Sequence, residues 1–179
     1  MAKDNSADIY RDIFATLTTS FSVRAERPDD TPYLFDIYRS CQHEYYDRLG
    51  FDGIALLGEA MVRDQFDLRE RAYRGAHPAA MRVIAEETGG GPVGRFIVDW
   101  SAEDGAHGVD LAVHPAHRRG GAGLHLLRAW VATADRQDRA ASLEVMPDNP
   151  ARAIYQRLGF VAEDWERMPV RMRRARRTP

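Results

Sequence analysis

Cysteine is almost absent from this sequence, which holds one, Cys41, in 179 residues. A single cysteine excludes an intrachain disulfide and a zinc site built from several thiolates. No apolar run approaches the roughly 20 residues that a membrane-spanning helix needs, and the polar N-terminus lacks the apolar core of a signal peptide. These absences predict a cytoplasmic protein that makes no membrane contact.

Acidic residues are missing from residues 167–179, which contain six arginines. Without those six charges the rest of the chain carries −8, against −2 for the whole. A basic end on an acidic body can contact nucleic acid, but it is also typical of a solvated tail or of a last strand with outward arginines. Since the body offers no matching basic surface, we expect no nucleic-acid partner.

Apolar periodicity changes along the chain and predicts a mixed α/β domain. In the middle, Phe96, Val98 and Trp100 alternate as in a strand, and after the glycines Leu124, Leu127 and Val131 recur at helical spacing. Asn149 as N-cap and Pro150 at the first helical position open a later helix, which Gly159 ends. The expected order is helix 8–17, strand 21–26, helix from 29 or 30 to 41, loop 41–53, helix 59–74, strands 81–87, 93–100 and 108–113, the helix after the glycines, strand 141–146, a helix to 158, and one or two strands by 172.

The middle strands follow one another through hairpins, whereas the later ones need a crossover helix. This order predicts one α/β (α+β) domain with a mixed sheet. We divide the chain into an N-terminal extension at 1–20, the domain at 21–172 and a basic tail at 173–179.

The stretch "RRGGAG", Arg118–Gly123, lies between an expected strand and an expected helix. Free amides at a helix start and the positive end of the helix dipole form an anion site, and glycines allow a ligand to approach the backbone. The loop therefore fits a pyrophosphate. It lacks the Gly-Lys-Ser/Thr of a phosphate-binding loop and the third glycine of a dinucleotide fingerprint.

The segment "VHPAHRRGGAGLHLL" resembles the acyl-CoA-binding motif of the GNAT acyltransferase superfamily at Val113, Pro115, Arg118, Gly121 and Gly123. Further on, "NPARAIYQRLGF" resembles the second signature of that superfamily. The resemblance implies a GNAT fold, acetyl-CoA as co-substrate and direct attack by an amine in a ternary complex. It also implies that the cofactor-binding residues are Leu111, Ala112, Val113, Arg118, Arg119, Gly120, Gly121, Ala122, Gly123, Asn149 and Arg152.

Catalytic roles follow from the same resemblance and from protonation chemistry. A tyrosine, with a pKa near 10, keeps its proton at pH 7 and can protonate a leaving thiolate, which makes Tyr155 the predicted general acid. Glu144 is the first candidate for the base and Asp110 the second. Each has an alternative: Tyr155 as a packing residue, and the carboxylates as solvated or hydrogen-bonded groups on a strand face.

The acceptor is expected to be a primary amine of a small molecule or a peptide. We expect it to bind against the segment 41–53, where Glu44, Tyr45 and Tyr46 are candidates for its walls. No metal site is expected, since no acidic cluster accompanies His114 and His117. A homodimer through the last strands is compatible with the resemblance. The alternative to an enzyme is a non-catalytic acyl-CoA-binding or partner-binding module with the same fold.

Overall fold

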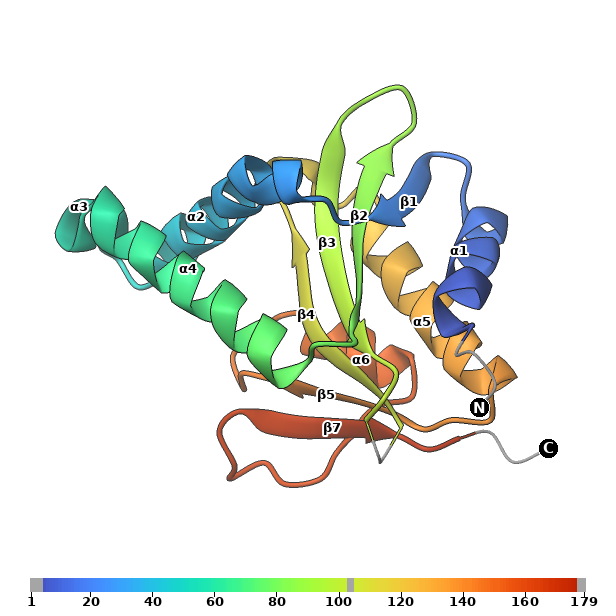
Figure 1. Cartoon of the computed structure of the whole chain (residues 1–179). Helices are drawn as coiled ribbons and strands as arrows, with labels where there is room; N and C mark the ends of the chain where they lie inside the picture. Colours follow the sequence, from blue (N-terminus) through green and yellow to red (C-terminus); the bar gives the residue numbers. More distant parts are fainter. Residues whose placement is uncertain (1–4, 103–104, 177–179) are drawn as a thin grey trace.

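A seven-stranded sheet forms the centre of the protein, in the order β1-β2-β3-β4-β5-β7-β6 (Figure 1). The structure is a computed structural model that describes residues 5–102 and 105–176. Neighbouring strands are antiparallel except β4 and β5, so the predicted mixed α/β sheet is confirmed. The strands are β1 Phe21–Ala25, β2 Met81–Glu87, β3 Pro92–Asp99, β4 Ala106–Val113, β5 Ala141–Val145, β6 Val161–Ala162 and β7 Val170–Arg174.

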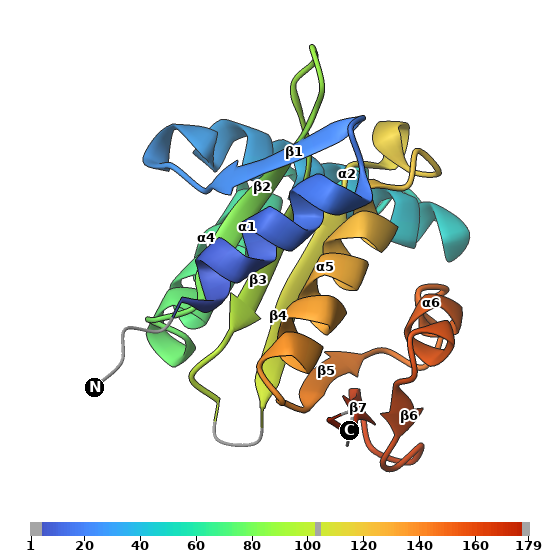
Figure 2. The same cartoon turned by 90° about the vertical axis from the view of Figure 1, so that its right-hand side faces the viewer.

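Helices cover both faces of this sheet. On one face lie α2, α3 and α4, and on the other α1 and α5 lie side by side (Figures 1 and 2). The short helix α6 packs near β5 and β7 and adds its apolar side chains to the cluster under α5. The helices are α1 Ser6–Leu17, α2 Thr31–Arg48, α3 Gly53–Leu57, α4 Glu59–Ala76, α5 Ala122–Arg136 and α6 Arg152–Arg157, with short 3-10 turns at Pro28–Asp30 and Pro115–His117.

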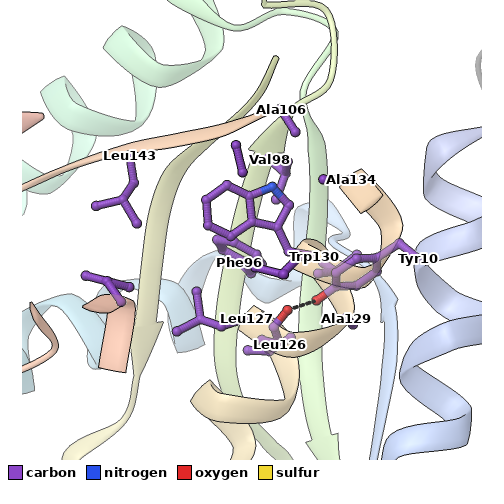
Figure 3. Close-up of a cluster of buried hydrophobic side chains, with 14 of the residues drawn as sticks. Tyr10, Phe96, Val98, Ala106, Leu126, Leu127, Ala129, Trp130, Ala134 and Leu143 are labelled. Atoms are coloured by element: carbon purple, nitrogen blue, oxygen red, sulfur yellow. Dashed lines mark hydrogen bonds between the residues drawn. The ribbon is translucent and has the colours of Figure 1, made fainter. Parts of the chain in front are cut away.

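The main core lies between α5 and the sheet, around the fully buried Trp130 (Figure 3). Its indole meets Phe96 edge-on at 5.5 Å between ring centroids and stacks on Phe160 at 5.2 Å. Gly108 of β4 makes room for the indole, because a Cβ there would lie 2.9 Å from Trp130. The predicted alternation of Phe96, Val98 and Trp100 is confirmed, since all three are buried in this cluster.

The helix α1 is part of the same core rather than an appendage to it. Tyr10 and Phe14 are buried, and the Tyr10 hydroxyl donates to the carbonyl of Leu126 on α5 at 3.2 Å (Figure 3). Burial raises the pKa of this tyrosine well above its ordinary value, so the hydroxyl remains a donor.

We expect Tyr10→Phe to lower the free energy of unfolding by about 1 kcal/mol, the usual net contribution of one buried hydrogen bond. Denaturant titration of both proteins measures the difference. Tyr45→Phe is the matched control, because the Tyr45 side chain is exposed and its change should stay within about 0.5 kcal/mol. Equal losses in the two variants would contradict a specific role for the Tyr10 hydroxyl.

The prediction of a loop over residues 41–53 is wrong for its first half, because α2 continues to Arg48. Polar side chains concealed the helix, yet they support it: the Gln42 amide donates to the Tyr38 hydroxyl one turn earlier at 2.9 Å. The stop signal is Gly50, whose φ of +85° follows the end of the helix. Beyond it, α3 was not predicted at all.

The predicted N-cap role of Asn149 is also wrong. Its Oδ1 accepts a hydrogen bond from the amide of Ala151 at 2.9 Å, and α6 begins only at Arg152. Asparagine side chains form such local turns in competition with helix, which explains the later start. Gly159, with a φ of +90°, follows the helix as expected.

Candidate active site

The sheet splits between β4 and β5, and this split positions the site. The two strands pair over three positions only, Gly108 with Leu143 being the last, whereas β4 stays paired with β3 as far as Val113. Val109 is an extra residue in β4, because Ile97 pairs with Asp110 and Val98 with Gly108. Such a bulge bends a strand and re-aims its side chains. The backbone of residues 109–113 therefore has no strand on its β5 side.

A cavity of about 1250 Å³ opens at this split. It is lined from both faces of the sheet: by α2 and α4 on one face, and by the start of α5 and by α6 on the other. Its described walls include Cys41, Gln42, Glu44, Tyr45, Arg48, Arg69, Tyr73, the β4 segment 108–113, residues 117–119 and 121–124, the β5 segment 143–146, and Asn149, Ile154 and Tyr155.

The start of α5 supplies open backbone donors to this cavity. Gly121, at the N-cap, has a φ of +95° and Arg119 one of +71°, which turn the loop toward the helix. Within the described chain, no residue accepts a hydrogen bond from the backbone amides of residues 119–124. A Cβ on Gly123 would lie 3.3 Å from Val113 Cγ2, so a side chain there would crowd the strand. Open amides at the positive end of a 15-residue helix suit an anion.

The two arginines of the loop differ in their contacts. Arg118 reaches back to α2, where its guanidinium pairs with Glu44 and donates to Cys41 Sγ at 3.3 Å, while its Nε donates to the Val113 carbonyl at 3.1 Å. Arg119 is exposed and forms no ion pair with a described residue. Arg118 thus fastens the loop to α2, whereas the exposed Arg119 keeps its charge available to a ligand.

Tyr155 of α6 lines the cavity with a largely buried side chain. Burial, assisted by the charge of Asp110, raises its pKa to about 12, so the phenol is protonated at neutral pH. Its hydroxyl forms no hydrogen bond with a described residue. The protonated hydroxyl can therefore donate a hydrogen bond to a ligand in the cavity.

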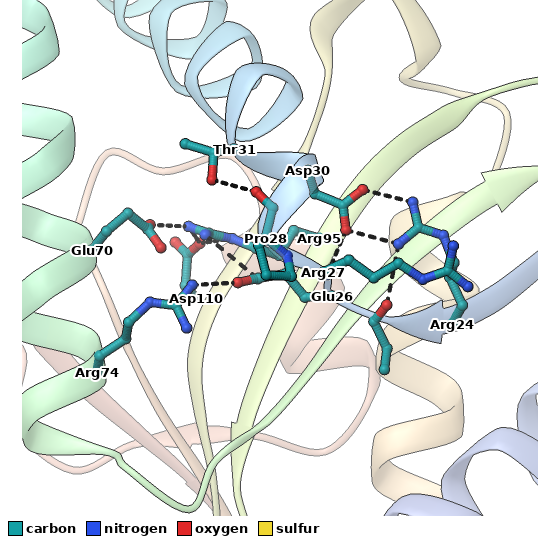
Figure 4. Close-up of polar contacts among 11 residues, drawn as sticks. Arg24, Glu26, Arg27, Pro28, Asp30, Thr31, Glu70, Arg74, Arg95 and Asp110 are labelled. Atoms are coloured by element: carbon teal, nitrogen blue, oxygen red, sulfur yellow. Dashed lines mark hydrogen bonds and ion pairs between the residues drawn. The ribbon is translucent and has the colours of Figure 1, made fainter.

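The two candidate bases lie in different surroundings. Asp110 is held by the buried Arg95, whose Nη2 lies 2.8 Å and whose Nε lies 3.2 Å from the same carboxylate oxygen (Figure 4). Glu144 lies on β5 at the cavity wall, 40% exposed, with one oxygen 3.3 Å from Arg167. Asp110 is therefore fixed in an ion pair, whereas Glu144 is accessible.

The other predicted residues are distributed as follows. Leu111, Ala112, Val113, Ala122 and Asn149 line the cavity. Gly120 and Arg152 are not among its lining residues. The Arg152 guanidinium instead donates to the Pro147 carbonyl and lies 4.3 Å from the Trp165 ring centre. Of the residues named for the acceptor, Glu44 and Tyr45 line the cavity, with Glu44 paired to Arg118.

Sequence reasoning missed Arg69 and Tyr73, which face the cavity from α4. Their spacing of four residues on one helix face was the available signal. It also missed Arg95, because a charged residue in a buried strand looks like a surface position until its partners are known. Arg95 pairs with both Glu70 and Asp110 at 2.8 Å. Burial alone would lower the pKa of Arg95, but the two carboxylates outweigh this effect and raise it.

The basic C-terminal stretch forms ion pairs. Arg174 of β7 donates to both oxygens of Asp135, one of them at 2.9 Å, and Arg176 lies 3.8 Å from Asp138. Arg177 lies outside the described residues. Over residues 5–102 and 105–176, no helix is long and apolar enough to cross a membrane, and no group of three or more His, Cys, Asp or Glu could hold a metal ion.

Residues 79–162 match the family model of the acetyltransferase (GNAT) domain. The PaiA N-acetyltransferase of Thermoplasma acidophilum, solved in complex with coenzyme A, superposes with a TM-score of 0.65 at 18% identity, over 88% of this chain and 99% of that one. A Corynebacterium glutamicum protein described as histone acetyltransferase HPA2 and related acetyltransferase superposes with a TM-score of 0.63 at 21% identity, over 90% of this chain and 99% of that one. No curated protein matches the sequence. The predicted GNAT fold is confirmed, and the family match covers residues 79–162 of the chain.

Proposed function

We propose that this protein is an N-acyltransferase that moves an acetyl group from acetyl-CoA to a primary amine of a small molecule or peptide. The observation that carries the proposal is that one cavity is lined both by residues 119 and 121–124, whose amides are open, and by Tyr155, whose hydroxyl is protonated. The amides and Arg119 would bind the pyrophosphate, and the unpaired β4 segment 111–113 would receive the pantetheine arm and the thioester oxygen.

The chemistry is a direct acyl transfer. The amine nitrogen attacks the thioester carbon, a C–N bond forms and the C–S bond breaks. The departing thiolate takes its proton from Tyr155, and the ammonium proton passes to a base. Glu144 suits that base better than Asp110, because Asp110 is engaged by Arg95 and Glu144 is accessible from the cavity.

We expect Gly121→Glu to weaken acetyl-CoA binding more than about tenfold, or about 1.4 kcal/mol, because it places an anion in the amide loop, the segment 119–124 with the open amides. Calorimetric titration of wild type and variant measures this. Gly75→Glu is the matched control, because Gly75 is exposed on α4, has an ordinary φ and has open space around its Cβ. Since Gly121 has a positive φ, the melting temperature of each variant is measured alongside.

Failure of wild type to bind acetyl-CoA would overturn the proposal. Binding with no release of free CoA from acetyl-CoA across a panel of primary amines would instead support the non-catalytic acyl-CoA-binding module.

A further inference from the structure

The guanidinium group of Arg69 is held in place on the α4 side of the cavity. Its Cζ lies 4.6 Å from the ring centre of Tyr38 and 5.5 Å from that of Tyr73, and the side chain is 30% exposed. Cation–π contacts with two rings fix the plane of a guanidinium without using its N–H donors. The group is therefore oriented before any ligand arrives.

The donors of this guanidinium are unused. Arg69 forms no hydrogen bond with any described residue, its Nε is buried without a partner, and the nearest carboxylate oxygen, Oδ1 of Asp110, is 3.9 Å from Nη1. The other oxygen of Asp110 belongs to Arg95, which also holds Glu70 (Figure 4). Asp110 thus offsets part of the charge of Arg69 but leaves the Nη1 and Nη2 donors without a hydrogen-bond partner among the described residues, so this pair of donors is available to a ligand in the cavity.

We propose that Arg69 binds the carboxylate of the acceptor, and that the acceptor class is therefore amino acids; this rests on the acyl transfer proposed above. A planar fork of N–H donors matches a carboxylate in two parallel hydrogen bonds. A monoanion fits beside Asp110, whereas the second charge of a phosphate would face that carboxylate. Asp110 belongs to the unpaired β4 segment and lies 3.9 Å from Arg69 Nη1, and both residues line the same cavity. An amine one carbon away from a carboxylate on Arg69 would therefore lie close to the split.

The test compares the twenty standard amino acids with their amides as acceptors, following release of free CoA from acetyl-CoA. An amide keeps the side chain and the amine but removes the negative charge. We expect wild type to prefer acid over amide in kcat/KM by at least about tenfold for its best side chain, the effect of a charged hydrogen-bonding pair. Arg69→Gln should remove the preference, and Arg69→Lys should keep part of it.

Arg71→Gln is the matched control, an exposed arginine on the same helix that does not line the cavity. It should keep the full preference for acids. Equal use of acids and amides by wild type, turnover of other amines but of no amino acid, or a preference that survives in Arg69→Gln would overturn the proposal and leave acyl transfer intact.

If no acceptor is acetylated although acetyl-CoA binds, the proposed function fails, and the carboxylate site is tested by binding alone. The same amino acids are titrated by calorimetry into the protein saturated with CoA. Binding that Arg69→Gln abolishes supports the site, and no binding to wild type overturns it.

Discussion

Arg95→Met is expected to lower the free energy of unfolding by about 3–5 kcal/mol, because removal of one partner leaves buried charges uncompensated. Arg95 is fully buried in β3, and Glu70, Asp110 and Glu26 lie around it at 2.8, 2.8 and 3.9 Å. Methionine keeps the length of the side chain, so the loss reports on charge rather than on an empty volume. Chemical denaturation at pH 8 measures it.

The matched control is Arg39→Met, which breaks an exposed pair with Glu59 at 3.0 Å and should cost less than about 1 kcal/mol. Neutralising the stranded carboxylates in the triple variant Glu70→Gln, Arg95→Met, Asp110→Asn should recover part of the loss. A loss equal to that of Arg39→Met would refute the central role assigned to Arg95.

Tyr155→Phe is expected to lower kcat by about 100-fold, the lower range for a positioned general acid, with little change in the KM for acetyl-CoA. Phenylalanine keeps the ring packed 6.2 Å from Phe160 and removes only the hydroxyl. Steady-state assays with the best acceptor measure the change. Tyr10→Phe is the control, because its hydroxyl lies in the core and away from the cavity, and its kcat should equal that of wild type.

The pH profile gives a separate check on the same residue. Because burial raises the pKa of Tyr155 to about 12, the phenol keeps its proton beyond its ordinary value of about 10. Deprotonation of Tyr155 should therefore not reduce kcat between about pH 8 and pH 10. An alkaline loss of kcat in that range that is absent from Tyr155→Phe would contradict this assignment.

Local patterns predicted the central strands and α5 well, because their apolar side chains pack directly on the core. Phe96, Val98 and Trp100 alternate in the sequence and lie in one buried cluster with Trp130. The end of α2 escaped prediction for the opposite reason. Its last turns are stabilised by polar and tertiary contacts such as the pair of Glu44 with Arg118, 74 residues away, which no local window contains.

The candidate site, too, could be predicted only in part from the sequence. The glycine loop and Tyr155 lie in motifs, and the cavity joins them. The spacing of Arg69 and Tyr73 was a weak signal, whereas Arg95 could not be found from sequence, because its surroundings depend on which carboxylates the fold brings to it. The bulge at Val109 was equally hidden, since one extra residue in a strand leaves the apolar pattern almost unchanged.

The two sides of the cavity at the split between β4 and β5 come from different parts of the chain. The wall on the α2 and α4 side comes from residues 41–73, whereas the amide loop, the unpaired strand and Tyr155 come from residues 108–155. The family match, residues 79–162, spans the second segment and leaves out the first. Under the function proposed above, substitutions in the α2–α4 segment are expected to change which acceptors are recognised and to leave the proposed acetyl-CoA site intact. The proposed function thus predicts that a change of acceptor needs changes in only one contiguous stretch of the polypeptide.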